Sequence, residues 1–275
     1  MEAIKLYLLC PLWGCEHLDL ELFLHKVKEE GYDGVDMWIP FEKKERNRLG
    51  RLLEQYELKI VSHQHQADGH SIREFCHSFD YYLQLCAELN PVLINSHSGR
   101  DYFSLADQLK VLDTAAEFEE RTGYKVAHET HRGRMLYAPG AAKQLFDLRK
   151  DFRITADFSH WVCVTESYLE HFEPIVKEAT RRTSHIHARV GFPEGPQVPD
   201  PRHSSYADAL HHFICFWSSI LENKIAQGLT SITVTPEFGP PPYMWTRLED
   251  DMPVASQWEI NLYIKQLFKK LVKLA

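Results

Sequence analysis

The fold class that the sequence predicts is α/β, in a single-domain barrel of eight parallel strands that are each followed by a helix. Three observations predict it. Short β-branched or apolar runs alternate with longer amphipathic stretches along all 275 residues, eight such runs occur, and most are continuously apolar. Continuous apolar strands are typical of a parallel sheet covered on both faces. Eight strand-helix units in a chain of this length favour a closed (β/α)8, or TIM, barrel over an open doubly wound sheet.

The strands are expected in chain order at regular intervals. Their runs are IKLYLLC (4–10), GVDMWI (34–39), KIVSHQ (59–64), VLINSHS (92–98), KVAHET (125–130), ITADFSH (154–160), SHIHARV (184–190) and SITVTPEF (231–238).

Helical patterns lie between these runs, and three are representative. The stretch 104–123 has an S-x-x-D start, leucines at helical spacing, and Gly123 where a helix stop is expected. The stretch 204–223 and the last helix, with Ile260, Ile264, Leu267 and Leu271, also place apolar residues on one face. No domain boundary or repeat appears, so one barrel is expected over 1–275. The proline-rich stretch 191–205 is long enough to be a functional loop.

Composition argues against several classes of function. The net charge of −8 repels phosphate backbones and anionic lipid, and the basic stretch 43–48 contains a glutamate. The start of the chain has Glu2 and a short, interrupted apolar run, so neither a signal peptide nor a membrane span is expected, and a cytoplasmic protein is. No glycine-rich nucleotide motif follows any strand. The six cysteines form no C-x-x-C pair, so disulfides are not expected.

Four metal-competent side chains stand at the ends of the last four strands. Glu129, Asp157, His187 and Glu237 are separated by 28, 30 and 50 residues (157 − 129, 187 − 157 and 237 − 187), and the longest step contains the proline-rich loop. In a barrel such residues converge at the carboxyl ends of the strands. His185 points to the same side as His187, which lies nearer the end of its strand and is preferred. Three carboxylates and one imidazole favour Mn²⁺, Mg²⁺ or Co²⁺ over Zn²⁺.

Motifs around these positions resemble a known superfamily. AHETHRG, ADFSHW, HIHAR and TPEFG, together with GYDGVDMW at 31–38, resemble the xylose isomerase-like TIM barrels, a group of sugar isomerases and epimerases that includes the ketose 3-epimerases. The resemblance implies that Glu129, Asp157, His187 and Glu237 bind a metal, that Glu129 and Glu237 form the acid/base pair, and that His160 binds substrate.

The resemblance therefore implies a metal-dependent isomerase or epimerase of carbohydrate metabolism, acting on a sugar or sugar acid. A divalent ion would stabilise an enediolate while one carboxylate removes a proton and the other returns one. The superfamily also suggests a homo-oligomer. Two positions depart from the ketose 3-epimerases, since Met135 and Pro193 stand where those enzymes have glutamate and arginine. Arg189, Arg202 and Arg132 are candidates for the missing cation.

The stretch KVAHETHRGR (125–134) is expected to be a strand and a turn, not a helical zinc motif. Glu129 and His131 then share one face, with His131 a further candidate substrate contact, and His128 packs on the other face. Trp13, Trp38, Trp161 and Trp245 fall near the same end of the barrel, and Trp13 and Trp38 are candidates for stacking on a sugar.

A second branch of the superfamily stays open as an alternative. The abasic-site endonucleases use three zinc ions, and this chain has His65, His97, Asp157 with His160, and Asp200 with Arg202 at similar spacing. Arg202 replaces a ligand, which disfavours a full cluster, while His97 and Asp200 remain candidates for a second metal and His65 and His97 for substrate contacts. The acidic charge disfavours DNA. A barrel that binds metal without catalysis is the third reading.

Overall fold

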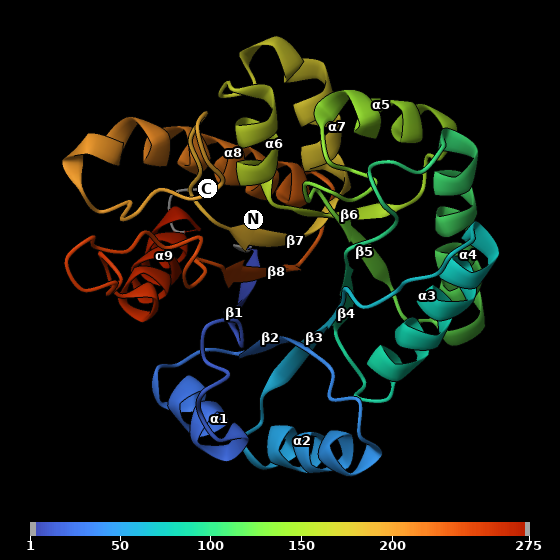
Figure 1. Ribbon diagram of the computed structural model, residues 1–275, viewed down its shortest axis with the longest axis horizontal. Coiled ribbons are helices and arrows are strands. Elements are labelled where there is room, and N and C mark those ends of the chain that lie inside the picture. Colours follow the sequence, from blue (N-terminus) through green and yellow to red (C-terminus); the bar gives the residue numbers. More distant parts are fainter. Residues whose placement is uncertain (1–3, 273–275) are drawn as a thin grey trace.

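The chain folds as one closed barrel of eight parallel strands, which confirms the predicted (β/α)8 class. A computed structural model describes residues 4–272. Each strand pairs with the next, and β8 pairs back with β1 (Figure 1). The strands are β1 (Lys5–Pro11), β2 (Gly34–Trp38), β3 (Lys59–Gln64), β4 (Leu93–Ser96), β5 (Val126–Glu129), β6 (Arg153–Ala156), β7 (Thr183–Ala188) and β8 (Ser231–Pro236).

Helices surround the ring of strands (Figure 1). They are α1 (Leu20–Glu29), α2 (Lys43–Gln55), α3 (Ile72–Ala87), α4 (Leu105–Thr122), α5 (Pro139–Leu148), α6 (Phe158–Thr165), α7 (Glu173–Arg182), α8 (Ala207–Ala226) and α9 (Gln257–Leu271), with short 3-10 turns η1 (Glu170–Phe172) and η2 (Ser204–Tyr206). None of these helices is long and apolar enough to cross a membrane, a finding limited to residues 4–272. Glu2 lies outside the described residues.

Helix α4 begins and ends where its sequence predicts. The Ser104 side chain accepts a hydrogen bond from the Asp107 N–H, which satisfies a free donor of the first turn. Gly123 follows the last helical residue with φ +82°, a left-handed conformation that favours glycine. The predicted helix 204–223 begins later than expected, because 204–206 form η2 and α8 starts at Ala207.

The predicted strand 154–160 is wrong beyond residue 156. Strand β6 ends at Ala156 and α6 begins at Phe158, so Asp157 is the N-cap of a helix and His160 lies within it. The reason is local: Asp157 Oδ1 accepts hydrogen bonds from Ser159 N at 3.0 Å and Ser159 Oγ at 2.5 Å, an arrangement that starts a helix. Strands β4, β7 and β8 also end two residues before their predicted ends.

The apolar core has two parts. The larger part fills the space between strands and helices, and a smaller cluster of Leu9, Val61, Leu93 and Ala127 fills the interior of the barrel. This inner cluster closes the barrel below the strand ends, as expected for a packed barrel and not a pore. All six cysteines are free thiols.

Candidate metal centre and substrate pocket

Inward-facing side chains change from apolar to polar toward the carboxyl ends of β3, β4 and β5. Side chains of a strand alternate between its two faces. Two residues beyond Val61, Leu93 and Ala127 therefore come His63, Asn95 and Glu129, and two residues further come His65, His97 and His131. The alternation builds a wall of imidazoles on one side of the barrel mouth.

The four residues predicted at the strand ends converge. One ligand atom each from Glu129, Asp157, His187 and Glu237 lies within 4.8 Å of the others, and all four residues are buried. His187 Nδ1 lies 2.9 Å from Glu237 Oε2 and 3.4 Å from Glu129 Oε1. The imidazole therefore stands between carboxylates from β5 and from the end of β8.

Asp36 on β2 orients this imidazole. Its Oδ2 lies 2.9 Å from His187 Nε2, and it also contacts His185 Nε2 at 3.0 Å and Thr235 Oγ1 at 3.0 Å. His185 Nδ1 is held by Thr233 Oγ1 at 2.8 Å, so both nitrogens of His185 are engaged. His187 keeps Nδ1 directed at the cluster, and the geometry therefore favours His187 over His185 as a metal ligand.

Arg189 reaches into the same cluster. Its Nη2 donates to Asp157 Oδ2 and to Glu237 Oε2, each at 2.7 Å, and the side chain is buried. The guanidinium also lies 4.8 Å from the centre of the Tyr243 ring. Arg189 was predicted to contact substrate, and it lines the pocket. Its Nη2, however, already donates to two predicted metal ligands, Asp157 and Glu237.

The pKa values of the clustered groups shift in different directions: those of His187 and Glu237 are raised, and that of Glu129 is lowered. Burial opposes the charged form of His187, yet Glu237 and Glu129 raise its pKa well above the ordinary value. Burial alone would raise the pKa of Glu129, but His97 and His187 hold it well below its usual range. Burial raises the pKa of Glu237 against the opposing effects of His187 and Arg189. The carboxylates around His187 thus favour the charged form of the imidazole, and His187 in turn favours the charged form of Glu129.

A second cluster shares Glu129. His63, His97 and Glu129 each place a ligand atom within 4.8 Å of the others, and His97 Nε2 lies 3.0 Å from Glu129 Oε2. Burial lowers the pKa of His63 to about 4 and that of His97 well below its usual range, which leaves both rings neutral and able to bind a metal. His131 and His160 form a further group with Glu129.

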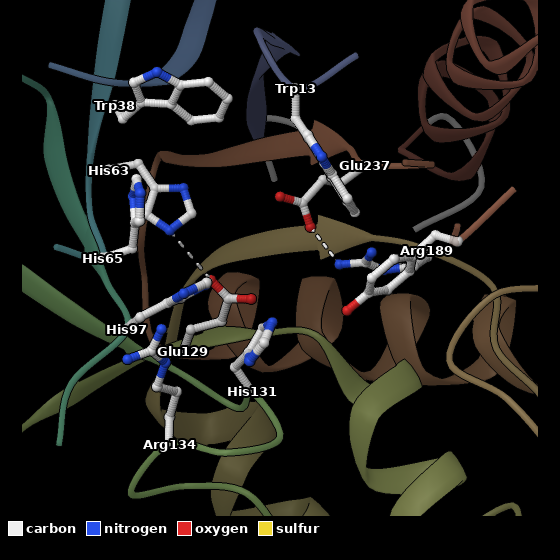
Figure 2. Close-up of a pocket in the computed structure, with 11 residues that line it drawn as sticks. Trp13, Trp38, His63, His65, His97, Glu129, His131, Arg134, Arg189 and Glu237 are labelled. Carbon is white, nitrogen blue, oxygen red and sulfur yellow. Dashed lines mark hydrogen bonds and ion pairs between the residues drawn. The ribbon is translucent and has the colours of Figure 1, made fainter. Parts of the chain in front are cut away.

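A cavity of about 290 Å³ opens onto these residues. Figure 2 shows the imidazoles on one side, Arg189 and Glu237 across from them, and Trp13 and Trp38 above. The lining residues are Trp13, Trp38, His63, His65, His97, Glu129, His131, Arg134, Arg189, Glu237 and Tyr243. The volume is at the lower end of the roughly 300–1,000 Å³ typical of small-molecule sites. It suits one small, compact molecule.

Sequence comparison agrees with this architecture. The family described as the xylose isomerase-like TIM barrel matches residues 24–212, from α1 into α8. The chain belongs to this family. No curated protein matches the chain by sequence.

Solved structures share the xylose isomerase-like fold at low identity. D-psicose 3-epimerase from Clostridium cellulolyticum H10 has a TM-score of 0.64 at 12% identity, covering 98% of this chain and 99% of its own. A xylose isomerase domain containing protein from Salmonella typhimurium LT2 has 0.62 at 16%, covering 99% of both chains. The probable 3-DHS dehydratase AsbF from Bacillus anthracis has 0.60 at 13%, covering 96% of this chain and 99% of its own. At these identities the likeness shows the fold alone.

Several predicted residues of this xylose isomerase-like barrel lie elsewhere than expected. Asp200 belongs to none of the metal-competent clusters among residues 4–272, because its carboxylate pairs with Arg202 at 2.8 Å. His160 is fully buried beneath His131, with ring centres 4.0 Å apart, and does not line the cavity. Trp161 is buried in the core and Trp245 is half exposed, so neither joins Trp13 and Trp38 at the cavity.

Four further residues contribute to the site and were not predicted from the sequence: Asp36, His63, Arg134 and Tyr243. An acid inside the apolar strand GVDMW was a signal for Asp36. The alternation that selected His65 equally selects His63, two residues earlier on the same inner face. Arg134 and Tyr243 lie in loops, where no period predicts a side chain's direction. His128 lies on the outer face, with its Nδ1 2.6 Å from Ser98 Oγ, in line with the predicted packing.

The donor atoms present fit a divalent metal. Buried polar atoms normally find a hydrogen-bond partner. Within residues 4–272, His63 Nε2, His187 Nδ1 and both ring nitrogens of His160 have no partner in hydrogen-bond geometry, although His187 Nδ1 lies 2.9 Å from Glu237 Oε2. These orphaned imidazole nitrogens lie in the clusters that share Glu129. Three carboxylates beside His187 supply the oxygen-rich set that Mn²⁺, Mg²⁺ or Co²⁺ prefers, so the site fits the metal that the family implies.

Proposed function

We propose that this barrel is a divalent-metal-dependent isomerase or epimerase of a sugar or sugar acid. The observation that carries the proposal is the buried convergence of Glu129, Asp157, Glu237 and His187 on one small cavity. Epimerases and isomerases among the structures with this fold, such as D-psicose 3-epimerase, support the reaction class. The net charge of −8 supports a small-molecule partner over nucleic acid.

Each side chain has a distinct part in the proposed reaction. Glu129, Asp157, His187 and Glu237 would hold the ion, which would polarise a substrate carbonyl and stabilise the enediolate that forms on proton loss. Glu129 and Glu237 come from different strands and both line the cavity, so one can take a carbon-bound proton and the other return one. Return to the opposite face inverts a centre. Asp36 holds His187 in place, and Trp13 and Trp38 offer flat apolar faces to a sugar ring.

Exchange of carbon-bound hydrogen with solvent tests this function. The purified chain, loaded with Mn²⁺, is incubated in D2O with a panel of ketoses, aldoses and sugar acids, and deuterium incorporation is read by mass spectrometry. We expect exchange for one class, lost by at least about a hundredfold in Glu129→Gln and Glu237→Gln. Glu117→Gln, an exposed change on α4, is the matched control. Absence of exchange throughout the panel would sink the isomerase proposal.

A multi-metal phosphoesterase is the second candidate, and the cluster of His63, His97 and Glu129 favours it. This cluster shares Glu129 with the first, so two ions close together could both contact one phosphate ester. Elemental analysis after dialysis against Mn²⁺ or Zn²⁺ separates the two readings. Two or more ions per chain, reduced by one in His63→Gln, would support a phosphoesterase. A single ion unaffected by that change would argue against it.

The third reading is a metal-binding barrel without catalysis. It predicts that the wild type binds ligand without solvent exchange, and that Glu129→Gln and Glu237→Gln leave ligand binding and biological function intact. The proposed reaction predicts exchange by the wild type that both variants lose. Ligand binding and exchange measured on the wild type and on both variants therefore decide between them.

A further inference from the structure

Arg134 presents a guanidinium to the cavity with no anionic partner. It lines the pocket near His97 and Glu129, across from Arg189 (Figure 2). Within residues 4–272, no carboxylate lies within 4.0 Å of its guanidinium nitrogens, and the buried Nη1 has no hydrogen-bond partner. A buried N–H donor without a hydrogen-bond partner costs free energy of folding. Such a donor is typical of a site where a bound ligand accepts the hydrogen bond.

Neighbouring arginines have hydrogen-bond acceptors for their guanidinium groups, and Arg134 has none. Arg189 donates to the carboxylates of Asp157 and Glu237, although its own Nη1 also lacks a partner. Arg100 donates to the Ala67 carbonyl at 2.7 Å and to the Gly99 carbonyl at 3.0 Å. Arg134 therefore differs from Arg100 and Arg189, whose guanidinium groups bind acceptors within the protein.

The loop after β5 holds Arg134 in this position. Gly133 has φ +74°, which turns the chain sharply after His131 and Arg132. The Arg134 N–H donates to the His131 carbonyl at 3.2 Å, and the next residue, Met135, is buried with its N–H bonded to the Ser98 carbonyl at 3.0 Å. The backbone on both sides is therefore fixed, and the side chain is directed at the cavity wall.

Acidic groups lie near Arg134 but do not contact its guanidinium. Burial and the nearby Arg100 lower the pKa of Arg134, while Glu129 and Asp101 oppose that shift without forming an ion pair. Burial, His63 and Arg134 lower the pKa of His65 to about 4, so this imidazole is neutral. An anion in the cavity would accept hydrogen bonds from the guanidinium, a planar donor that matches two oxygens.

We propose that Arg134 binds an anionic group of the substrate, a carboxylate or a phosphate. The proposal rests on the proposed function and narrows its substrate to a sugar acid or a sugar phosphate. The cavity of about 290 Å³ is small, so the anion and the reacting carbons belong to one compact molecule. Arg134 is then a specificity-determining residue, placed beside Glu129 in the loop that follows the same strand.

Anion binding tests the proposal without a known substrate. The Mg²⁺-loaded chain is titrated with acetate and with inorganic phosphate by calorimetry, in the wild type, Arg134→Met, Arg134→Lys and the control Arg51→Met. Arg51 is exposed on α2 and does not line the cavity. We expect at least tenfold weaker binding of one anion in Arg134→Met, partial retention in Arg134→Lys, and no change in the control. The anion affected identifies the source, carboxylate or phosphate.

Equal binding by wild type and Arg134→Met, or no binding by the wild type, overturns the inference. The deuterium exchange panel distinguishes a failure of the anion-site inference from a failure of the proposed isomerase function. Exchange of neutral sugars that is unchanged in Arg134→Met removes the anion site and leaves the isomerase. Arg134-dependent anion binding without exchange of any sugar keeps the anion site and removes the isomerase.

Discussion

Arg189 places a permanent positive charge between two carboxylates that a divalent metal would also use. Its Nη2 lies 2.7 Å from both Asp157 Oδ2 and Glu237 Oε2. Unit charges about 4 Å apart interact by about 4 kcal/mol at an effective dielectric constant of about 20. Removal of the guanidinium is therefore expected to strengthen metal binding, because the ion no longer competes with it.

We expect Arg189→Met to bind Mn²⁺ at least about tenfold more tightly than the wild type, a gain of about 1.4 kcal/mol. The metal-free variant is expected to be less stable by about 3–5 kcal/mol, since two buried carboxylates lose their partner. Competition with a fluorescent chelator gives the affinity, and urea unfolding in EDTA gives the stability. Arg202→Met, which removes a guanidinium paired with Asp200 away from the clusters, serves as control. Weaker metal binding by Arg189→Met would contradict this account.

At the scale of elements, the junction of β6 and α6 gives Asp157 two functions. Oδ1 caps the helix through Ser159, while Oδ2 faces Arg189. Asparagine keeps an oxygen that can cap the helix, and alanine does not. We expect Asp157→Ala to be less stable than Asp157→Asn by about 0.5–2 kcal/mol in EDTA. Both variants are expected to lose most metal affinity. Equal stabilities in urea unfolding would show that the cap contributes nothing.

Much of the architecture could be predicted from the sequence because the patterns are periodic. Continuous apolar runs predicted a parallel sheet, and the spacing of Glu129, Asp157, His187 and Glu237 predicted their convergence, which the structure shows. Their roles as ligands and as an acid/base pair stay predictions. Periodicity cannot place side chains that leave the strands. The helix after Asp157 depends on a local cap, and Arg134 depends on the turn at Gly133.

The partners of Arg189 could not be predicted from the sequence, for a different reason. Its position on the inner side after β7 was predictable, but a long side chain can reach several partners, and pattern alone does not choose among them. The pairing of Asp200 with Arg202 is of the same kind. The second-metal role predicted for Asp200 depended on its spacing from Arg202 in the loop after β7, whereas the structure places His63 beside His97 and Glu129.

At the scale of the whole molecule, the family resemblance predicts a homo-oligomer. The hairpin-like loop between β8 and α9 bears apolar side chains in solvent: Leu248 is 98% exposed and Met252 is 55% exposed. Single exposed apolar residues are common on protein surfaces, whereas a group of them more often marks a protein–protein contact surface. We expect light scattering to give a mass above one chain, and Leu248→Glu to reduce it. A monomeric wild type would contradict the oligomer.

Histidines dominate the expected response of the metal-free protein to acid. Seven of them have pKa values lowered by burial: His63, His65, His97, His128, His131, His160 and His185. The unfolded chain takes protons on these rings below about pH 6.5, and the folded chain does not until near the lowered values, about 4 for His63 and His65. His187, whose pKa is raised, is charged in both states below about 6.5 and adds no slope there.

Stability is therefore expected to be present above about pH 6.5 and to fall as the pH drops from about 6.5 to 5. Glu237, whose pKa is raised by burial, takes up its proton first in the folded chain and opposes this fall by at most one proton, fewer than the seven histidines contribute. Each excess proton on the unfolded chain contributes up to about 1.4 kcal/mol per pH unit. Urea unfolding in EDTA at several pH values measures the slope. His128→Gln, outside the metal clusters, should lower that slope by about one proton, because burial lowers the pKa of His128 to about 3. A free energy of unfolding that is constant or rises between pH 6.5 and 5 would refute the assignment of these histidines as neutral.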